Sequence, residues 1–371
     1  MNPVRLLGVG TSVPPHRIEQ PDAARFASWL SAHDEEQARR VAVLYRRAGV
    51  RGRHMVVLDK APEAGDGPEE LQRLFQPAVA GDTAGAKGPT TGERMSYYAE
   101  RAAPLAERAA RAALADADVE ADAITHLVTI SCTGFMAPGV DIALIGRLGL
   151  NPGVERAHIG FMGCQGALNG LRVARALASA SAAHRVLLCA VELCGLHLQY
   201  VDEPDLIVAN SLFADGASAA VIGSRDDAAN DRWTITAHGS TLIPESLDAM
   251  TWTIGDHGFT MTLSARVPGL IESNLRAWME TWLTTQGLRV EDVGSWAIHP
   301  GGARIISAVE KSLAIDPATS AASREVLACY GNMSSPTVLF VMQRLIAAQA
   351  PTPCVALAFG PGLSAEATLF S

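Results

Sequence analysis

The stretch GFMGCQGALNG, residues 160–170, decides how the chain folds. A mostly apolar run at residues 157–162 predicts a buried strand, and apolar residues at helical spacing follow from Leu171 to Leu177. The glycines between them let the chain turn sharply. Cys164 would then lie in the first turn of a helix, where the helix dipole favours a thiolate. On this stretch alone, a nucleophile and an ordinary buried cysteine are equally good interpretations.

Composition indicates an ordinary α/β protein. Of 371 residues, 48% are hydrophobic and 19% are charged, which argues against disorder. The net charge of −9 argues against a general nucleic-acid binder. The six cysteines form no CxxC pair and no zinc-type cluster, so we expect reduced thiols, no metal and a cytoplasmic protein. Neither a signal pattern nor an apolar run long enough to span a membrane is present.

The first third of the chain predicts a strand at residues 4–9, a single helix at 21–47, a loop at 59–92 and a helix at 95–115. Gly8 and Gly10 do not make a dinucleotide-binding loop, because the third glycine is missing and prolines follow. Residues 46–53 hold four arginines. They form either a solvated surface patch or a binding site for a phosphorylated ligand. The second interpretation follows from the match between the arginine side chain and phosphate geometry.

The second half of the chain repeats the order of the first. A strand at 124–131 ends at Cys132, and a strand at 295–298 ends at His299. A turn leading into a helix follows in each half, 32 residues later at Cys164 and 33 residues later at Asn332. We therefore predict two similar halves, residues 1–226 and 227–371, with a linker at 224–232. A pseudo-twofold arrangement would bring the equivalent loops, and with them Cys164, His299 and Asn332, together.

These three residues have a chemical logic as a group. A cysteine nucleophile needs a histidine that holds its thiolate as an ion pair. His299 and Asn332 together would donate two hydrogen bonds to one developing oxyanion. Taken separately, His299 is typical of a structural histidine and Asn332 of a helix N-cap. No Asp or Glu is evident as a general base, and a carbanion formed by loss of CO₂ needs none.

Four motifs resemble the signatures of type III polyketide synthases, the chalcone and stilbene synthase family of the thiolase superfamily: Gly163-Cys164-Gln165-Gly166, Ile298-His299-Pro300-Gly301-Gly302, Tyr330-Gly331-Asn332-Met333-Ser334-Ser335 and Phe359-Gly360-Pro361-Gly362. The resemblance extends over nearly the whole chain. It implies an α/β, thiolase-like fold of duplicated αβαβα half-domains, in five layers with mixed sheets. Ketoacyl synthases III share the Cys-His-Asn set but are less similar in the last two motifs.

The resemblance also implies a mechanism. A starter acyl group passes from coenzyme A to Cys164, and malonyl-CoA then loses CO₂ to give an enolate that His299 and Asn332 stabilise. Coenzyme A thioesters are substrates, and the family needs no metal or redox cofactor. The resemblance further implies a homodimer that binds neither nucleic acid nor membranes. The positions that match basic contacts to coenzyme A are Arg47, Arg51 and Arg304.

Other positions bear on the substrate. Phe213 and Met261 match two gatekeepers, and His197 stands where plant enzymes have a small polar residue, so it would shrink or polarise the cavity. Ala137 falls where the partner subunit would reach in. The remaining expected substrate contacts are Cys132, Thr133, Cys194, Ser334, Gly360, Pro361 and Gly362. We expect bacterial-type pyrone or resorcinol chemistry on a fatty starter. The alternatives are a single-condensation ketoacyl synthase that uses a carrier protein and a non-catalytic acyl-binding protein.

Overall fold

The computed structural model describes residues 3–31, 34–63, 65–77, 88–200, 203–224 and 233–371. Most of the predicted linker, residues 225–232, lies outside this set. A five-stranded mixed sheet forms the first half, in the order β1 (Arg5–Ser12), β7 (Asp215–Gly223), β6 (Arg185–Leu193), β4 (His126–Ser131) and β5 (Glu155–Gly160). A four-stranded sheet forms the second, in the order β8 (Ile235–Leu242), β13 (Ser364–Phe370), β12 (Cys354–Gly360) and β11 (Ser295–Ile298).

The two sheets have the same internal pattern. In each, one parallel pair (β4 with β6, β11 with β12) is followed by two antiparallel pairings. The predicted repeat is therefore confirmed, with one difference. The first sheet has a fifth strand, β5, parallel to β4. In the second half, the residues before the Asn332 turn form the helix α10 (Ala321–Tyr330) instead.

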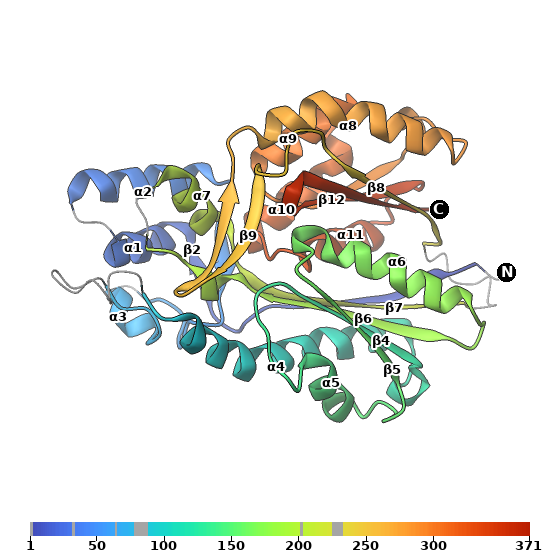
Figure 1. Cartoon of the computed structure of the whole chain (residues 1–371), viewed down its shortest axis with the longest axis horizontal. Helices are drawn as coiled ribbons and strands as arrows, with labels where there is room; N and C mark the ends of the chain where they lie inside the picture. The colour runs from blue at the N-terminus through green and yellow to red at the C-terminus, as the bar shows by residue number, and fades with distance from the viewer. Residues whose placement is uncertain (1–2, 32–33, 64, 78–87, 201–202, 225–232) are drawn as a thin grey trace.

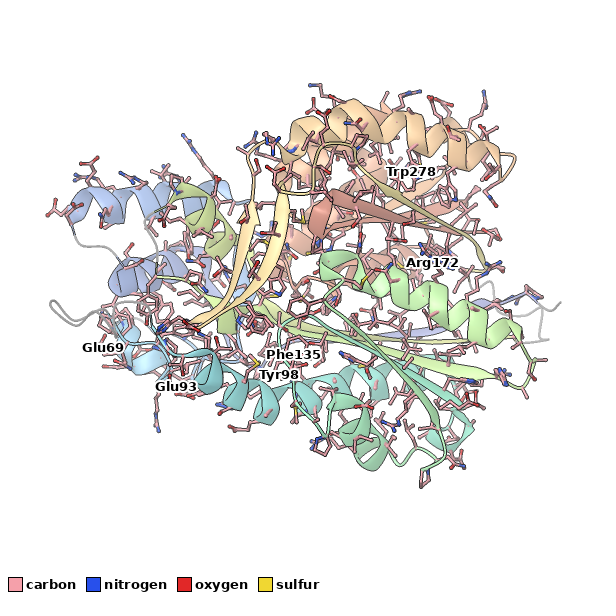
Figure 2. All side chains as sticks on the ribbon, viewed as in Figure 1. Glu69, Glu93, Tyr98, Phe135, Arg172 and Trp278 are labelled. Atoms are coloured by element: carbon pink, nitrogen blue, oxygen red, sulfur yellow. The ribbon has the colours of Figure 1, made fainter. Side chains whose placement is uncertain are left out.

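Helices fill the space between the sheets and cover their outer faces (Figure 1). The central layer consists of α6 (Gly166–Ser179) and α11 (Thr337–Ala347), which share one apolar cluster with both sheets. The first sheet is covered by α4 (Thr91–Ala117) and α5 (Val140–Leu148), and the second by α8 (Val267–Thr284) and α9 (Ala303–Leu313). Tyr98 on α4 and Trp278 on α8 mark these outer layers in Figure 2. The result is the predicted five-layered α/β fold.

Strand β6 shows why the sheets are buried on both faces. Leu187, Cys189 and Val191 pack toward the outer layer, whereas Val186 and Leu188 pack toward the central helices. Alternation along a strand sends successive side chains to opposite faces. A continuous apolar strand therefore packs against helical layers on both faces of the sheet. The smaller elements are β2 (Arg17–Glu19), β3 (Gly52–His54), α3 (Pro68–Leu71), α7 (Pro204–Leu212), β9 (Met250–Gly255) and β10 (Gly258–Leu263).

Two local predictions were wrong. The single helix at residues 21–47 is two helices, α1 (Gln20–Ser31) and α2 (Glu35–Arg47). The Asp34 side chain accepts a hydrogen bond from the Gln37 N–H, so it starts α2 as its N-cap. The apolar run at residues 157–162, predicted to be a buried strand, lies in β5 and just after it. None of its residues is in the buried class, because β5 is the edge strand of its sheet.

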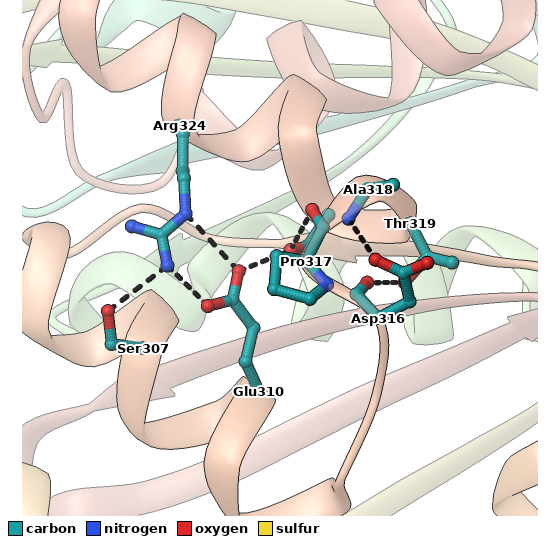
Figure 3. A network of polar contacts seen from close by, with 8 residues as sticks. Ser307, Glu310, Asp316, Pro317, Ala318, Thr319 and Arg324 are labelled. Atoms are coloured by element: carbon teal, nitrogen blue, oxygen red, sulfur yellow. Dashed lines mark hydrogen bonds and ion pairs between the residues drawn. The ribbon is translucent and has the colours of Figure 1, made fainter.

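A polar network holds α10, which leads to the Asn332 turn, against α9 (Figure 3). The Arg324 guanidinium on α10 donates to Glu310 and to Ser307 on α9. The Ser320 hydroxyl donates to the same Glu310 carboxylate at 2.6 Å. Asp316 caps the short turn between the helices by accepting from the Ala318 N–H at 2.9 Å. Because charged hydrogen bonds are strong when partly buried, this network holds the first turn of α10 against α9.

The glycines near the N-terminus have a packing role. A Cβ at Gly10 would lie 2.2 Å from the Ala109 carbonyl oxygen and 2.3 Å from the Ala113 nitrogen on α4. We expect Gly10→Ala to lower the free energy of unfolding by about 3 kcal/mol, because backbone atoms cannot move aside. Gly269→Ala on α8 is the control, since no atom lies within 4 Å of its added Cβ. Urea unfolding checks both, and equal midpoints for wild type and Gly10→Ala would contradict the packing argument.

Candidate active site

Cys164 lies in a short 3₁₀ turn, Gly163–Gln165, that joins β5 to α6. Gly163 has a φ of +66°, and Phe161 before it has +57°, so the chain reverses within a few residues. A Cβ at Gly163 would lie 2.4 Å from Pro361 Cδ. The glycine therefore lets the Gly360–Gly362 loop of the second half approach the cysteine closely.

Asn332 is fixed by backbone hydrogen bonds to the first half. Its N–H donates to the Leu212 carbonyl, and its own carbonyl accepts from the Ala214 N–H. Its side-chain oxygen accepts from the Ser334 N–H at 2.8 Å, and its Nδ2 points to the Gly301 carbonyl at 3.4 Å. Because α11 begins only at Thr337, Asn332 is not the N-cap of that helix.

His299 follows β11, and its backbone N–H donates to the Leu357 carbonyl at 2.7 Å. The residue is 2% exposed, and neither ring nitrogen has a hydrogen-bond partner among the described residues. Burial lowers the pKa of His299 to about 3, so the ring is neutral in this structure. A buried polar ring with two open nitrogens is uncommon, because buried polar groups are normally paired. It indicates a ligand site.

The Cys164 thiol contacts the second half directly. Burial raises the pKa of Cys164 to about 11, while hydrogen bonds with the side chains of Ser334 and Asn332 act in the opposite direction. Asn332 thus contacts the thiol and also reaches the Gly301 carbonyl of the His299 loop. With the thiol pKa raised by burial, the start of a helix does not by itself give a thiolate at neutral pH. A thiolate here needs a proton acceptor.

Seven of the other candidate residues lie in three places. Cys194, His197, Phe213 and Met261 line one small cavity of about 30 Å³. Arg47 and Arg304 line a second cavity, of about 150 Å³, together with Gly301 and Gly302 of the His299 loop. Arg51 lines neither cavity but a surface groove between α1 and α2, and its Nη2 lies 3.2 Å from Cys329 Sγ.

Glu192 is a site residue that the sequence did not reveal. It is fully buried on β6 and joins the two halves: it accepts from the Cys132 N–H at 2.9 Å, the Thr133 hydroxyl at 2.7 Å and the Ser335 hydroxyl at 2.8 Å. Burial raises the pKa of Glu192 to about 7. The sequence did contain one signal for this residue: a single carboxylate inside an apolar strand. Burying a carboxylate costs free energy unless the group is hydrogen-bonded.

His197 fills the small cavity as part of an aromatic cluster. Its Nδ1 accepts from the Phe259 N–H at 3.0 Å, so Nε2 carries the proton and donates to the Thr133 carbonyl at 2.7 Å. The ring stacks on Phe259 at 4.1 Å between centroids and stands edge-on to Trp252 at 5.4 Å. Burial lowers the pKa of His197 to about 3. The histidine is therefore a neutral, fully hydrogen-bonded part of the cavity wall.

Two features are absent from the described residues. Within the part of the chain that the structure describes, no group of three His, Cys, Asp or Glu side chains is placed to hold a metal ion. Across the same residues, no helix combines the length and the apolar character needed to cross a membrane.

Comparison with known proteins identifies the family. Residues 2–226 match the N-terminal domain of chalcone and stilbene synthases, and residues 234–371 match their C-terminal domain. The fold is thiolase-like, and the chain belongs to the chalcone and stilbene synthase family, the type III polyketide synthases, which are acyltransferase-type enzymes.

Individual relatives agree with this assignment. The alpha-pyrone synthesis polyketide synthase-like protein Pks18 of Mycobacterium tuberculosis is 33% identical, over 98% of this chain and 90% of that protein. The 1,3,6,8-tetrahydroxynaphthalene synthase of Streptomyces peucetius is 31% identical, over 97% of this chain and 91% of its own length. The crystal structure of PKS-I from the brown alga Ectocarpus siliculosus superimposes with a TM-score of 0.91 at 30% identity, covering 100% of this chain and 98% of that one.

Proposed function

We propose that Cys164 accepts a starter acyl group from coenzyme A and that the bound acyl group is then extended with malonyl-CoA. Neutral His299 takes the proton of the Cys164 thiol as sulfur attacks the thioester carbonyl, and the coenzyme A thiol leaves with a proton. The proposal requires no cofactor other than the coenzyme A thioesters that serve as substrates. The observation that carries it is the pair of open, buried nitrogens on His299 beside an asparagine that contacts the thiol.

In the condensation step, malonyl-CoA loses CO₂ and leaves an enolate. Nitrogen-bound protons of His299 and Asn332 would hydrogen-bond the enolate oxygen, and its carbon would attack the Cys164 thioester and release the cysteine thiolate. Loss of CO₂ supplies the electron pair, so no carboxylate base is needed. Repeated rounds followed by ring closure would give a pyrone- or resorcinol-type product, in keeping with the pyrone synthesis named for the mycobacterial relative.

Arg47 and Arg304 support binding of coenzyme A. Both are exposed, and both line the cavity that reaches Gly301 and Gly302 beside His299. Two guanidinium groups at such an opening suit the phosphates of coenzyme A, because arginine forms paired hydrogen bonds with phosphate oxygens. Arg51, on the other side of α2, would contact only a distal part of the substrate.

We propose that the acyl chain enters the small cavity lined by His197, Phe213 and Met261, and the size of this cavity favours a short starter. A cavity of about 30 Å³ has room for only a few water molecules. A fatty chain needs far more room, and the side chains that occupy the space are His197, Trp252 and Phe259. We therefore replace the expected fatty starter with a short acyl group.

His197 sets this limit. We expect His197→Ala to raise kcat/KM for hexanoyl-CoA relative to acetyl-CoA about tenfold, because removing the imidazole opens space for additional methylenes. A series of acyl-CoA starters, with products measured by mass spectrometry, tests this. His197→Gln is the matched control, since it keeps most of the volume and a polar group. An unchanged starter preference in the alanine variant, with a native circular dichroism spectrum, would contradict the role of His197.

We also propose a cytoplasmic homodimer. The outer edge of β5 has no partner among the described strands. Beside it, Phe135 is 48% and Ile142 43% exposed, and both line a groove of about 620 Å³ together with Tyr98 and Ala137 (Figure 2). An open strand edge next to exposed apolar side chains suits a second copy of the chain. The six cysteines are free, which suits a reducing compartment.

Product analysis tests the proposed function. The chain is incubated with malonyl-CoA and a short acyl-CoA, and products are identified by mass spectrometry. Several added two-carbon units and a cyclised product are expected. Products that stop after one unit would favour a ketoacyl synthase, and the absence of both acyl transfer and CO₂ release would overturn the proposal.

A further inference from the structure

The C-terminal half of α2 carries an unusual concentration of positive charge. Residues 37–58 contain six arginines and no acidic residue, in a chain whose net charge is −9. One of them, Arg53, is buried and donates to the Asn210, Ser211 and Phe213 carbonyls, so it has a structural role. The five exposed arginines are Arg39, Arg40, Arg46, Arg47 and Arg51.

A surface groove of about 900 Å³ runs between α1 and α2. Its apolar floor includes Ala24 and Ala42, and its arginines are Arg25, Arg39, Arg46 and Arg51. None of the described residues that line it is acidic. Arg25 forms an ion pair with Asp22, and Arg39 forms one with Glu35. Both arginines are largely exposed, and ion pairs of this kind contribute little energy. Arg46 makes no ion pair with the described residues. The groove therefore combines an apolar floor with cations that an acidic partner can reach.

The groove adjoins the proposed entrance for coenzyme A. Arg46 lines the groove, whereas Arg47 lines the cavity that it shares with Arg304 and the His299 loop. Consecutive residues of a helix point about 100° apart, so the end of α2 separates the two openings. A molecule seated in the groove would lie next to the cavity that leads toward His299.

We propose that this groove docks an acidic, amphipathic helix of an acyl carrier protein, which delivers the starter as a phosphopantetheine thioester. The inference rests on the proposed function. Helix-in-groove recognition uses an apolar face against an apolar floor, and carboxylates would pair with the arginines. Coenzyme A has its own arginines, Arg47 and Arg304, at the cavity. A small anion would leave the apolar floor uncovered.

The transfer is a balanced thioester exchange. The Cys164 sulfur attacks the carrier's thioester carbonyl, and a new carbon–sulfur bond forms there. The bond to the phosphopantetheine sulfur breaks, and that sulfur leaves as a thiol with the proton that His299 took from Cys164. No oxidant or reductant takes part, and the same chemistry runs with free acyl-CoA.

The test compares two donors of one acyl group: butyryl-CoA and a purified acyl carrier protein that bears a butyryl-phosphopantetheine group. The variant is the double charge reversal Arg39→Glu with Arg46→Glu. With the carrier, kcat/KM should fall about tenfold or more, while with butyryl-CoA it should change less than about twofold. Arg73→Glu, a reversal at a side chain 89% exposed outside the groove, is the control and should change neither value.

Each remaining outcome overturns the proposal. Equal losses with both donors would mean that the groove serves coenzyme A. Transfer from butyryl-CoA alone by the wild type would mean that no carrier docks. If the double variant loses co-sedimentation with phosphatidylglycerol vesicles but keeps carrier kinetics, the groove binds anionic lipid instead. Failure of the proposed function is distinct, because neither donor would then acylate natively folded wild type.

Discussion

Cys164→Ala should lower product formation by about 10³-fold or more, since it removes the atom that holds the growing chain. The cysteine is 6% exposed, so the substitution leaves the surface unchanged. Decarboxylation of malonyl-CoA should continue measurably, because the proposed enolate site is formed by His299 and Asn332. Product is measured by mass spectrometry and CO₂ release from radiolabelled malonyl-CoA.

Cys354→Ala is the matched control for this prediction. Cys354 is also a buried free thiol, but it begins β12 and lines none of the cavities described above. Its removal should leave turnover within about twofold, because it touches neither the thioester nor the enolate. Persistent turnover by Cys164→Ala would contradict the assignment and direct attention to Cys132, whose Sγ accepts from the Gly163 N–H at 3.1 Å.

His299→Ala should also have a large effect, but on two measurable steps. Malonyl-CoA decarboxylation should fall about 10²- to 10³-fold, because one of the two proposed enolate donors is lost. Alkylation of Cys164 by iodoacetamide at pH 7 should also become slower, with its apparent pKa shifted upward. Burial is the main cause that raises the pKa of this thiol to about 11, and the variant lacks the base that would take its proton.

A half-buried histidine, His238, provides the control for His299. Burial lowers the pKa of His238 to about 4, and this residue lies on β8, away from the cysteine. His238→Ala should therefore leave both the decarboxylation rate and the alkylation profile unchanged. If His299→Ala decarboxylates malonyl-CoA at the wild-type rate, then His299 does not stabilise the enolate.

The sequence predicted that the Cys164 and Asn332 turns meet because the repeat carries spatial information. The turns that contain Cys164 and Asn332 occupy equivalent places in two similar halves. In the structure, α6 and α11 meet in the central layer, and the Asn332 side chain contacts the Cys164 thiol. Pattern alone was sufficient here, because each half must bury its helix against the other.

Other features depend on neighbours that a pattern does not contain. β5 has apolar residues like a buried strand, but its exposure follows from its place at the edge of the sheet. Glu192 looked like part of an ordinary strand, and its three donors come from segments as far apart as Cys132 and Ser335. The volume of the small cavity likewise depends on how His197 and Phe259 stack, which the spacing of residues in the sequence does not predict.

The most direct test of the account is the covalent intermediate. Wild-type protein is mixed with a short acyl-CoA in the absence of malonyl-CoA, quenched in acid and measured by intact-mass and peptide mass spectrometry. We expect one added acyl group, located on the peptide that contains Cys164. An acyl group on another residue, or an unmodified protein that still turns over when malonyl-CoA is added, would contradict it.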